Sequence, residues 1–321
     1  MEYGFELALC AHLERDPSRE WVLGRQLGAA VADPGRRVID VVGLAPGPAF
    51  DDRAEIGTDA IPPAVIESDL GVGRARRPEA VLDTHPDRRD DVVDAAVDAG
   101  FLEREWRDGT ELVRQPTRYP DDWFDTLVGV ENKPDLDRPG DLADQLRRDA
   151  SLGLFDRVVL ATASHVTRAH LNRIPDPVGV WRFDPEAGTR EVVRDPEPLS
   201  PADAGLEVGE RRAAATDVRV VSAAAKRRRR RRIAERVYGG GWRPTTYPAC
   251  ARCVPDDDGL PYCEAFERVV DPGHDCGADC PRHDPADPPA VDVARLRAER
   301  TPWVRDPDGV ARRQAGLDRF G

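Results

Sequence analysis

The pattern of apolar and polar positions predicts a helix and then a strand in the first 45 residues. In residues 3–14, Phe5, Leu9 and Leu13 recur at helical spacing, which predicts an amphipathic helix. Residues 36–44 form an apolar run rich in valine and isoleucine that ends in Ala-Pro-Gly-Pro, which predicts a strand with Asp40 in its middle. A helix and a strand in succession suit a sheet with helices on its faces.

The same pattern resumes at Trp123. Residues 123–133 read as a strand, 141–154 as a helix, 155–164 as a second apolar strand, and 178–195 as a hairpin turning at residues 186–188. This alternation predicts an α/β fold, with a mixed sheet flanked by helices, over residues 1–59 and 117–200.

Residues 60–116 interrupt that core and have their own local order. A helix is expected to start at Pro62 and Pro63, a second one covers residues 90–100, and a hairpin turns at Asp108 and Gly109. Helix, helix and hairpin is the order of a winged-helix unit, so this insertion is a candidate for contact with nucleic acid. A packing module is the open alternative, because both helices are acidic.

The composition changes beyond residue 200. Residues 201–247 contain seven consecutive basic residues on an expected helix that ends at Gly239. A cysteine-rich region follows at 248–285, and the proline- and charge-rich tail, 286–321, is expected to be partly disordered.

The acidic composition of the chain does not by itself identify the class of protein or its partner. The 321 residues carry a net charge of -13 with a pI near 5.1, and only two lysines occur, Lys133 and Lys226. This profile resembles proteins of salt-loving microbes, whose carboxylate surfaces stay soluble in concentrated salt. It therefore does not exclude a nucleic-acid partner. With no long apolar segment and no basic, cleavable start, we expect a cytoplasmic protein without membrane contact.

One of the two lysines lies in the strand of residues 123–133. Glu131 and Lys133 are two residues apart, so they project to the same side of the strand. A carboxylate can hold a divalent metal that polarises a phosphate, and an ammonium group can stabilise the developing charge or orient the attacking water. Lysine suits this role better than arginine because its ammonium group acts as a compact point charge.

A metal site needs a second carboxylate, and the sequence offers two. Asp125 lies on the same strand as Glu131, and the six intervening steps place it about 20 Å away in an extended strand. Asp40 would lie beside Glu131 if its strand pairs with residues 123–133, so we prefer Asp40. The alternative for Asp40 is an ion pair with Arg36 or Arg37.

This order of elements resembles the PD-(D/E)XK nuclease superfamily, which has a restriction-endonuclease-like fold. The matching parts are Glu6 in the first helix, Asp40, the pair Glu131 and Lys133, Gln145 in the next helix, and the strand of residues 155–164. The resemblance covers roughly residues 2–195 and implies a metal-dependent nuclease, with Mg²⁺ or Mn²⁺ on Asp40 and Glu131 and with Lys133, Gln145 and Glu6 assisting. Asp40 lies about ninety residues before Glu131, much farther than is usual in the family, so residues 60–116 must be an insertion.

Five of the six cysteines lie close together near the C-terminus. Their chelate spacings predict a thiolate metal site, and Zn²⁺ on Cys250, Cys253, Cys276 and Cys280 is the simplest assignment, with Cys263, His274 and His283 as substitutes. The alternative is an iron-sulfur cluster on Cys10, Cys250, Cys253 and Cys263, because some nucleases of the superfamily hold such a cluster with one cysteine near the first helix and three near the C-terminus.

The basic run has two readings of equal weight. Its members are candidate contacts for a phosphate backbone, or they dock on the acidic surface of the protein itself. They are Lys226, Arg227, Arg228, Arg229, Arg230, Arg231 and Arg232.

Two classes of function follow from these features. The first is a metal-dependent nuclease acting on DNA through Asp40, Glu131 and Lys133. The second is a non-catalytic nucleic-acid-binding or regulatory protein with a structural metal, of which a nuclease fold with a vestigial site is a variant.

Overall fold

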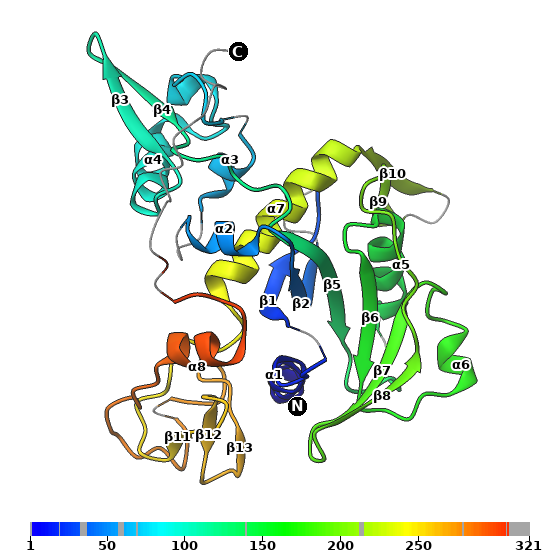
Figure 1. Ribbon diagram of the computed structural model, residues 1–321. Coiled ribbons are helices and arrows are strands. Elements are labelled where there is room, and N and C mark those ends of the chain that lie inside the picture. The colour runs from blue at the N-terminus through cyan, green and yellow to red at the C-terminus, as the bar shows by residue number, and fades with distance from the viewer. Residues whose placement is uncertain are drawn as a thin grey trace.

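The structure is a computed structural model that describes residues 2–18, 20–32, 37–56, 61–68, 70–138, 140–211, 215–277, 279–305 and 307. Its central element is a six-stranded mixed sheet flanked by helices, which confirms the expected α/β class (Figure 1). The strands, in spatial order, are β1 (Val22–Gly28), β2 (Val38–Pro46), β5 (Phe124–Asn132), β6 (Arg157–Thr162), β7 (Gly179–Asp184) and β8 (Thr189–Arg194).

The strand directions bring two distant parts of the chain together. β1, β2 and β5 are antiparallel neighbours, whereas β5, β6 and β7 run parallel, and β8 returns antiparallel to β7. Helix α5 (Leu142–Leu152) provides the crossover between the parallel strands β5 and β6. In the β2 and β5 pair, Val41 lies opposite Val130. The sheet therefore joins residues that the insertion separates in sequence.

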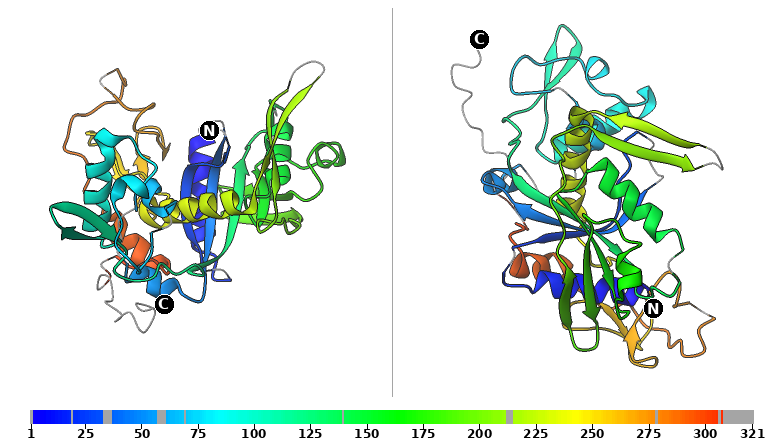
Figure 2. Two further views of the ribbon diagram at one scale, coloured as in Figure 1. Left: turned by 90° about the horizontal axis from the view of Figure 1, so that it is seen from above. Right: turned by 90° about the vertical axis from the view of Figure 1, so that its right-hand side faces the viewer.

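Helices cover both faces of the sheet. On one face, Phe5 and Leu9 of α1 (Glu2–Glu14) share an apolar cluster with Val41 and Val130. On the other face, α5 and α7 (Ala223–Gly240) close a second cluster that includes Leu127. Figures 1 and 2 show α7 running along the sheet. The predicted first helix is thus confirmed, and each face has its own core.

Residues 201–247 are more closely integrated with the core than the sequence suggests. Ile233, Val237 and Tyr238 of α7 are buried in the second cluster. A hairpin that the composition did not reveal, β9 (Gly205–Arg211) and β10 (Thr216–Val221), precedes the helix. The helix ends at Gly240, one residue beyond the predicted end.

The insertion contains the elements in the expected order. After α2 (Phe50–Ala54) come α3 (Pro63–Ile66), two short 3₁₀ turns (Pro78–Ala80 and Pro86–Arg88), α4 (Arg89–Asp98), and the hairpin of β3 (Glu103–Arg107) and β4 (Thr110–Arg114). The first helix has only four residues, so it is much shorter than a recognition helix. Asp108 and Gly109 both have positive φ, 50° and 74°, as a tight hairpin turn requires.

The C-terminal part consists of short elements. β11 (Cys253–Pro255), β12 (Pro261–Cys263) and β13 (Arg268–Val269) form a small sheet, followed by α8 (Val293–Arg300). Part of the tail expected to be disordered is therefore helical, and Trp303 packs near Tyr238 with 6.3 Å between ring centres. The remainder, residues 306 and 308–321, lies outside the described residues. No helix in the part of the chain that the structure describes is long and apolar enough to cross a membrane.

Candidate active site and cysteine cavity

The five side chains predicted to be catalytic line one cavity of about 570 Å³, the carboxylate cavity. Glu6 comes from α1, Asp40 from β2, Glu131 from the end of β5, Lys133 from the residue just after β5, and Gln145 from α5. The order of the strands explains this convergence. Because β2 and β5 are neighbours, Asp40 and Glu131 lie side by side, and α1 and α5 add Glu6 and Gln145 from the two faces of the sheet. Residues that lie far apart in the sequence thus line the same cavity.

Asp40 and Glu131 are cross-strand neighbours. The register that sets Val41 opposite Val130 sets Asp40 opposite Glu131 one step further. Asp40 Oδ2 accepts a hydrogen bond of 2.8 Å from the backbone N–H of Asn132. Arg37 does not pair with Asp40 in any hydrogen bond or ion pair of the described residues, and Arg36 lies outside them.

Burial makes both carboxyl groups hard to ionise. It raises the pKa of Asp40 to about 6, with a further contribution from Glu6, although the hydrogen bond from Asn132 opposes the rise. It raises the pKa of Glu131 to about 8, helped by the charge of Asp40 and opposed by Arg37. A cation between such groups would favour their charged forms.

Arg37 links Glu131 to a second buried carboxylate that the sequence analysis missed. Its Nη2 lies 2.6 Å from Glu131 Oε2 and 2.6 Å from Asp149 Oδ2, and its Nε donates to Asp149 Oδ1 at 3.0 Å. Asp149 lies on the buried face of α5 together with Leu142 and Leu146. An acidic residue in the apolar stripe of a helix indicates a buried carboxylate, and this pattern could have identified Asp149 from the sequence.

Glu6 is held by two residues of β1 that the sequence analysis also missed. Its carboxylate accepts hydrogen bonds from Arg25 and, at 3.0 Å, from Gln26. Gln26 also reaches Asp40 Oδ1 at 3.4 Å, and its φ of 53° is rare for a residue other than glycine. Backbone strain of this kind clusters at functional sites. Gln26 thus connects the two carboxylates across β1 and β2.

Lys133 lies just beyond the end of β5 and is not paired with Glu131. Its Nζ is 3.8 Å from Glu2 Oε1, and its side chain is 29% exposed. The backbone of Lys133 continues the sheet pairing, because its N–H donates to Ala161 O at 2.9 Å. The ammonium group is therefore accessible in the cavity rather than locked in a closed ion pair.

The basic run of α7 faces both inward and outward. Its buried members donate hydrogen bonds to protein oxygens: Lys226 to Ser200 O (2.9 Å), Arg229 to Gly28 O (3.0 Å), and Arg230 to Leu154 O (2.7 Å) and Asp156 Oδ2 (2.7 Å). Arg231 and Arg232 lie 3.5 Å from Asp121 and Glu67. Only Arg227 and Arg228 are fully exposed members of the run. Much of it therefore docks on the protein itself.

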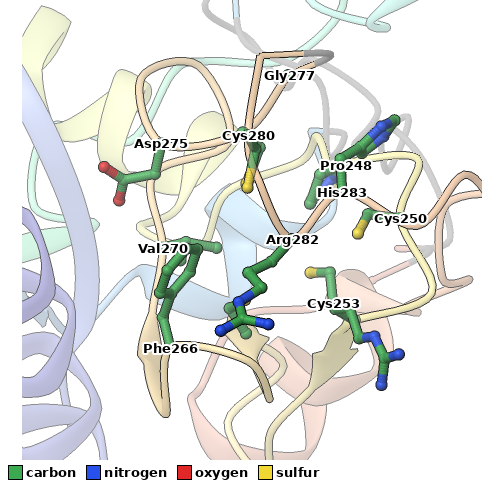
Figure 3. A pocket seen from close by; sticks show the side chains of 13 residues that line it. Pro248, Cys250, Cys253, Phe266, Val270, Asp275, Gly277, Cys280, Arg282 and His283 are labelled. Atoms are coloured by element: carbon green, nitrogen blue, oxygen red, sulfur yellow. The ribbon is translucent and has the colours of Figure 1, made fainter.

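The five C-terminal cysteines line a second, small cavity, the cysteine cavity, together with His283 (Figure 3). Its volume is about 20 Å³. Burial and the neighbouring thiols raise the pKa of Cys253 to about 11. Cys10 does not line this cavity, because it is buried in α1 among apolar side chains, and His274 is exposed beside Asp275.

Neither cavity holds a preformed cage of protein ligands. Among the described residues, no group of three or more His, Cys, Asp or Glu side chains is arranged to hold a metal ion. The carboxylate cavity offers Asp40 and Glu131 as neighbouring donors, and Mg²⁺ is usually bound by one or two carboxylates, with water and phosphate oxygens completing its shell.

A family model described as "Family of unknown function (DUF5787)" matches residues 22–285. Comparisons with curated proteins and with solved structures found no match.

Proposed function

The chain belongs to DUF5787, a family of unknown function, and we propose that it is a metal-dependent nuclease that hydrolyses phosphodiester bonds of DNA. One observation carries this proposal: α1, β2, β5 and α5 bring Glu6, Asp40, Glu131, Lys133 and Gln145 to a single cavity. Buried carboxylates beside an accessible lysine suit a reaction in which a metal and a cation act on a phosphate.

The order of elements supports the same proposal. The core begins with helix α1 and the antiparallel strands β1, β2 and β5. The crossover helix α5 then leads to β6, which runs parallel to β5. This order is similar to that of the PD-(D/E)XK core, with a winged-helix-like insertion between β2 and β5. The insertion accounts for the long separation of Asp40 and Glu131 in sequence.

Each residue of the cavity has a role that its contacts suggest. Asp40 and Glu131 would hold Mg²⁺ or Mn²⁺, which supplies Lewis-acid polarisation of the phosphate and a water of lowered pKa. Lys133 approaches the phosphate from the same edge and stabilises its developing charge. Gln145 lines the same cavity and would orient the attacking water, and Glu6 keeps Arg25 and Gln26 in place.

Positive side chains outside the carboxylate cavity would bind the DNA backbone. Arg227 and Arg228 of α7 are exposed and free to meet phosphate oxygens. The insertion adds the β3 and β4 hairpin, on which Trp106 is 66% exposed. An exposed aromatic side chain on a hairpin suits stacking against a base.

The ion pair of Glu131 with Arg37 favours a second candidate function. Arg37 already balances the charge of one of the two carboxylates that would hold the metal. In that case the protein binds nucleic acid without cutting it. An assay of labelled single- and double-stranded DNA and RNA with Mg²⁺ or Mn²⁺ in molar KCl separates the two. Cleavage by wild type that Asp40→Asn abolishes supports the nuclease, whereas binding of all substrates without cleavage supports the second candidate.

A further inference from the structure

The cysteine cavity has no part in the proposed cleavage, yet five cysteines line it. Figure 3 shows three of them, Cys250, Cys253 and Cys280. Cys250 comes from the turn before β11, Cys253 begins β11 and Cys263 ends β12. Cys276 and Cys280 come from the loop that follows β13. We propose that this cavity binds a single thiophilic metal ion, Zn²⁺ by preference, through four of these five thiolates. We also infer that the ion fixes the loop after β13 against the carboxylate cavity.

Backbone hydrogen bonds and strand pairing hold Cys250, Cys253 and Cys263 next to one another. The N–H of Cys253 donates to the carbonyl of Cys250 at 3.0 Å, which closes the turn between them. Cys253 lies opposite Cys263 in the β11 and β12 pair. The N–H of Asp284 points at Cys250 Sγ at 3.5 Å, and such a bond favours the thiolate form that a metal requires.

The remaining two thiols are placed to complete the site. Cys276 and Cys280 are only partly buried and lie outside helices and strands, unlike the three buried cysteines. The described residues contain no set of three donors at coordinating positions, so binding draws these outer thiols inward. Spacings of two and three residues within each pair suit tetrahedral chelation by sulfur.

The size of the cavity favours a single ion over an iron-sulfur cluster. A volume of about 20 Å³ holds roughly one water-sized body, because one such body needs about 10 to 15 Å³. The cluster arrangement would also require Cys10, which lies within α1 and does not border the cavity.

The loop after β13 forms part of the wall of both cavities. Asp271 lines the carboxylate cavity, and Asp275, next to Cys276, lines the cysteine cavity. The two are joined directly, because the N–H of Asp271 donates to Asp275 Oδ2 at 3.0 Å and the N–H of Asp275 donates to Asp271 O at 2.7 Å. A metal on Cys276 would therefore hold Asp271 in place. The importance of this wall for cleavage rests on the proposed function.

The metal site is tested on the full chain by measuring bound zinc and by titrating Co²⁺ into metal-free protein. We expect one ion per chain and the intense near-ultraviolet charge-transfer bands of thiolate-bound Co²⁺. Cys250→Ser and Cys253→Ser should lower metal affinity by at least about tenfold, because each removes a ligand. Cys10→Ala is the matched control and should bind normally. Wild type that takes up neither ion, or Cys10→Ala that loses it equally, would overturn the site.

The link between the cavities is tested by hydrogen exchange before and after zinc is removed with a chelator. We expect amide protons of residues 264–277 to exchange at least about tenfold faster without zinc, whereas those of β5 and β6 stay unchanged. Unchanged exchange in this loop would overturn the link. Neither readout depends on cleavage, so a failure here is distinguishable from a failure of the nuclease proposal.

Discussion

The backbone N–H of Asn132 donates a hydrogen bond of 2.8 Å to Oδ2 of Asp40. It ties the carboxylate of β2 to the end of β5, one residue after Glu131. The insertion separates these strands in sequence, yet the bond and the register make Asp40 and Glu131 neighbours. The central claim is that this pairing, with Lys133 beside it, forms a metal-dependent site for phosphodiester hydrolysis.

Arg37 is expected to be essential for stability, because it is the cation shared by Glu131 and Asp149. Arg37→Met should lower the free energy of unfolding by about 3 to 5 kcal/mol, the usual effect of leaving buried charges uncompensated. Urea denaturation in molar KCl measures the change. Arg147→Met is the control, because Arg147 is exposed and the loss expected from its ion pair with Asp144 is below about 1 kcal/mol. Equal losses in both variants would contradict the role of Arg37.

Glu131→Gln is expected to stabilise the metal-free protein at high pH. The folded-state pKa of Glu131, about 8, is raised above its usual value, so its ionisation opposes folding. This penalty is absent below the usual pKa and grows as the pH rises to about 8. The variant should therefore be more stable than wild type by at least about 1 kcal/mol at pH 8 and show a smaller gain at pH 5. Thermal melts at both pH values measure this, and a less stable variant at pH 8 would refute it.

Metal binding is expected to release a proton near neutral pH. Because the pKa values of Asp40 and Glu131 are raised to about 6 and about 8, this pair of carboxyl groups holds part of a proton at pH 7, which a divalent cation must displace. Calorimetric titration with Mn²⁺ in buffers of different ionisation enthalpy should show release at pH 7 and almost none at pH 9. Heats that do not depend on the buffer at pH 7 would contradict this account.

The two faces of α7 are expected to respond differently to substitution. Replacing both exposed residues, as Arg227→Gln with Arg228→Gln, should weaken DNA binding and reduce the slope of log affinity against log salt by about 2. Stability should not change. Arg230→Met removes the hydrogen bonds to Leu154 and Asp156 and should instead destabilise the fold by about 1 to 3 kcal/mol. An unchanged salt slope in the double variant would exclude this contact with DNA.

The sequence contained enough information to predict the pairing of β2 with β5. Each strand is an apolar run with a candidate carboxylate, Asp40 or Glu131, and the resemblance to the nuclease superfamily implied that the two carboxylates share a site. Strand β1 was missed because Gly24, Arg25 and Gln26 break its apolar pattern. Close packing on α7 favours glycine at position 24, since a Cβ there would lie 3.1 Å from Val237.

The inward face of α7 could also have been predicted. Lys226, Arg230, Ile233 and Val237 recur at helical spacing, and the two apolar members show that this face is buried. The consecutive basic residues made that periodicity hard to recognise in the sequence. By contrast, the hydrogen bonds of Arg37 to both Glu131 and Asp149 depend on how α5 packs on the sheet, which local patterns do not specify.

Cleavage of labelled DNA by wild type, Glu131→Gln, Lys133→Ala and Asp125→Asn, with Mn²⁺ in molar KCl, tests the central claim most directly. Asp125 lies on the same strand but is exposed and remote from the cavity, so it is the matched control. The account predicts that wild type and Asp125→Asn cut the DNA, whereas Glu131→Gln and Lys133→Ala bind it but cut at least about 100-fold more slowly. Cleavage by Lys133→Ala at the wild-type rate, or binding by wild type without cleavage, would contradict it.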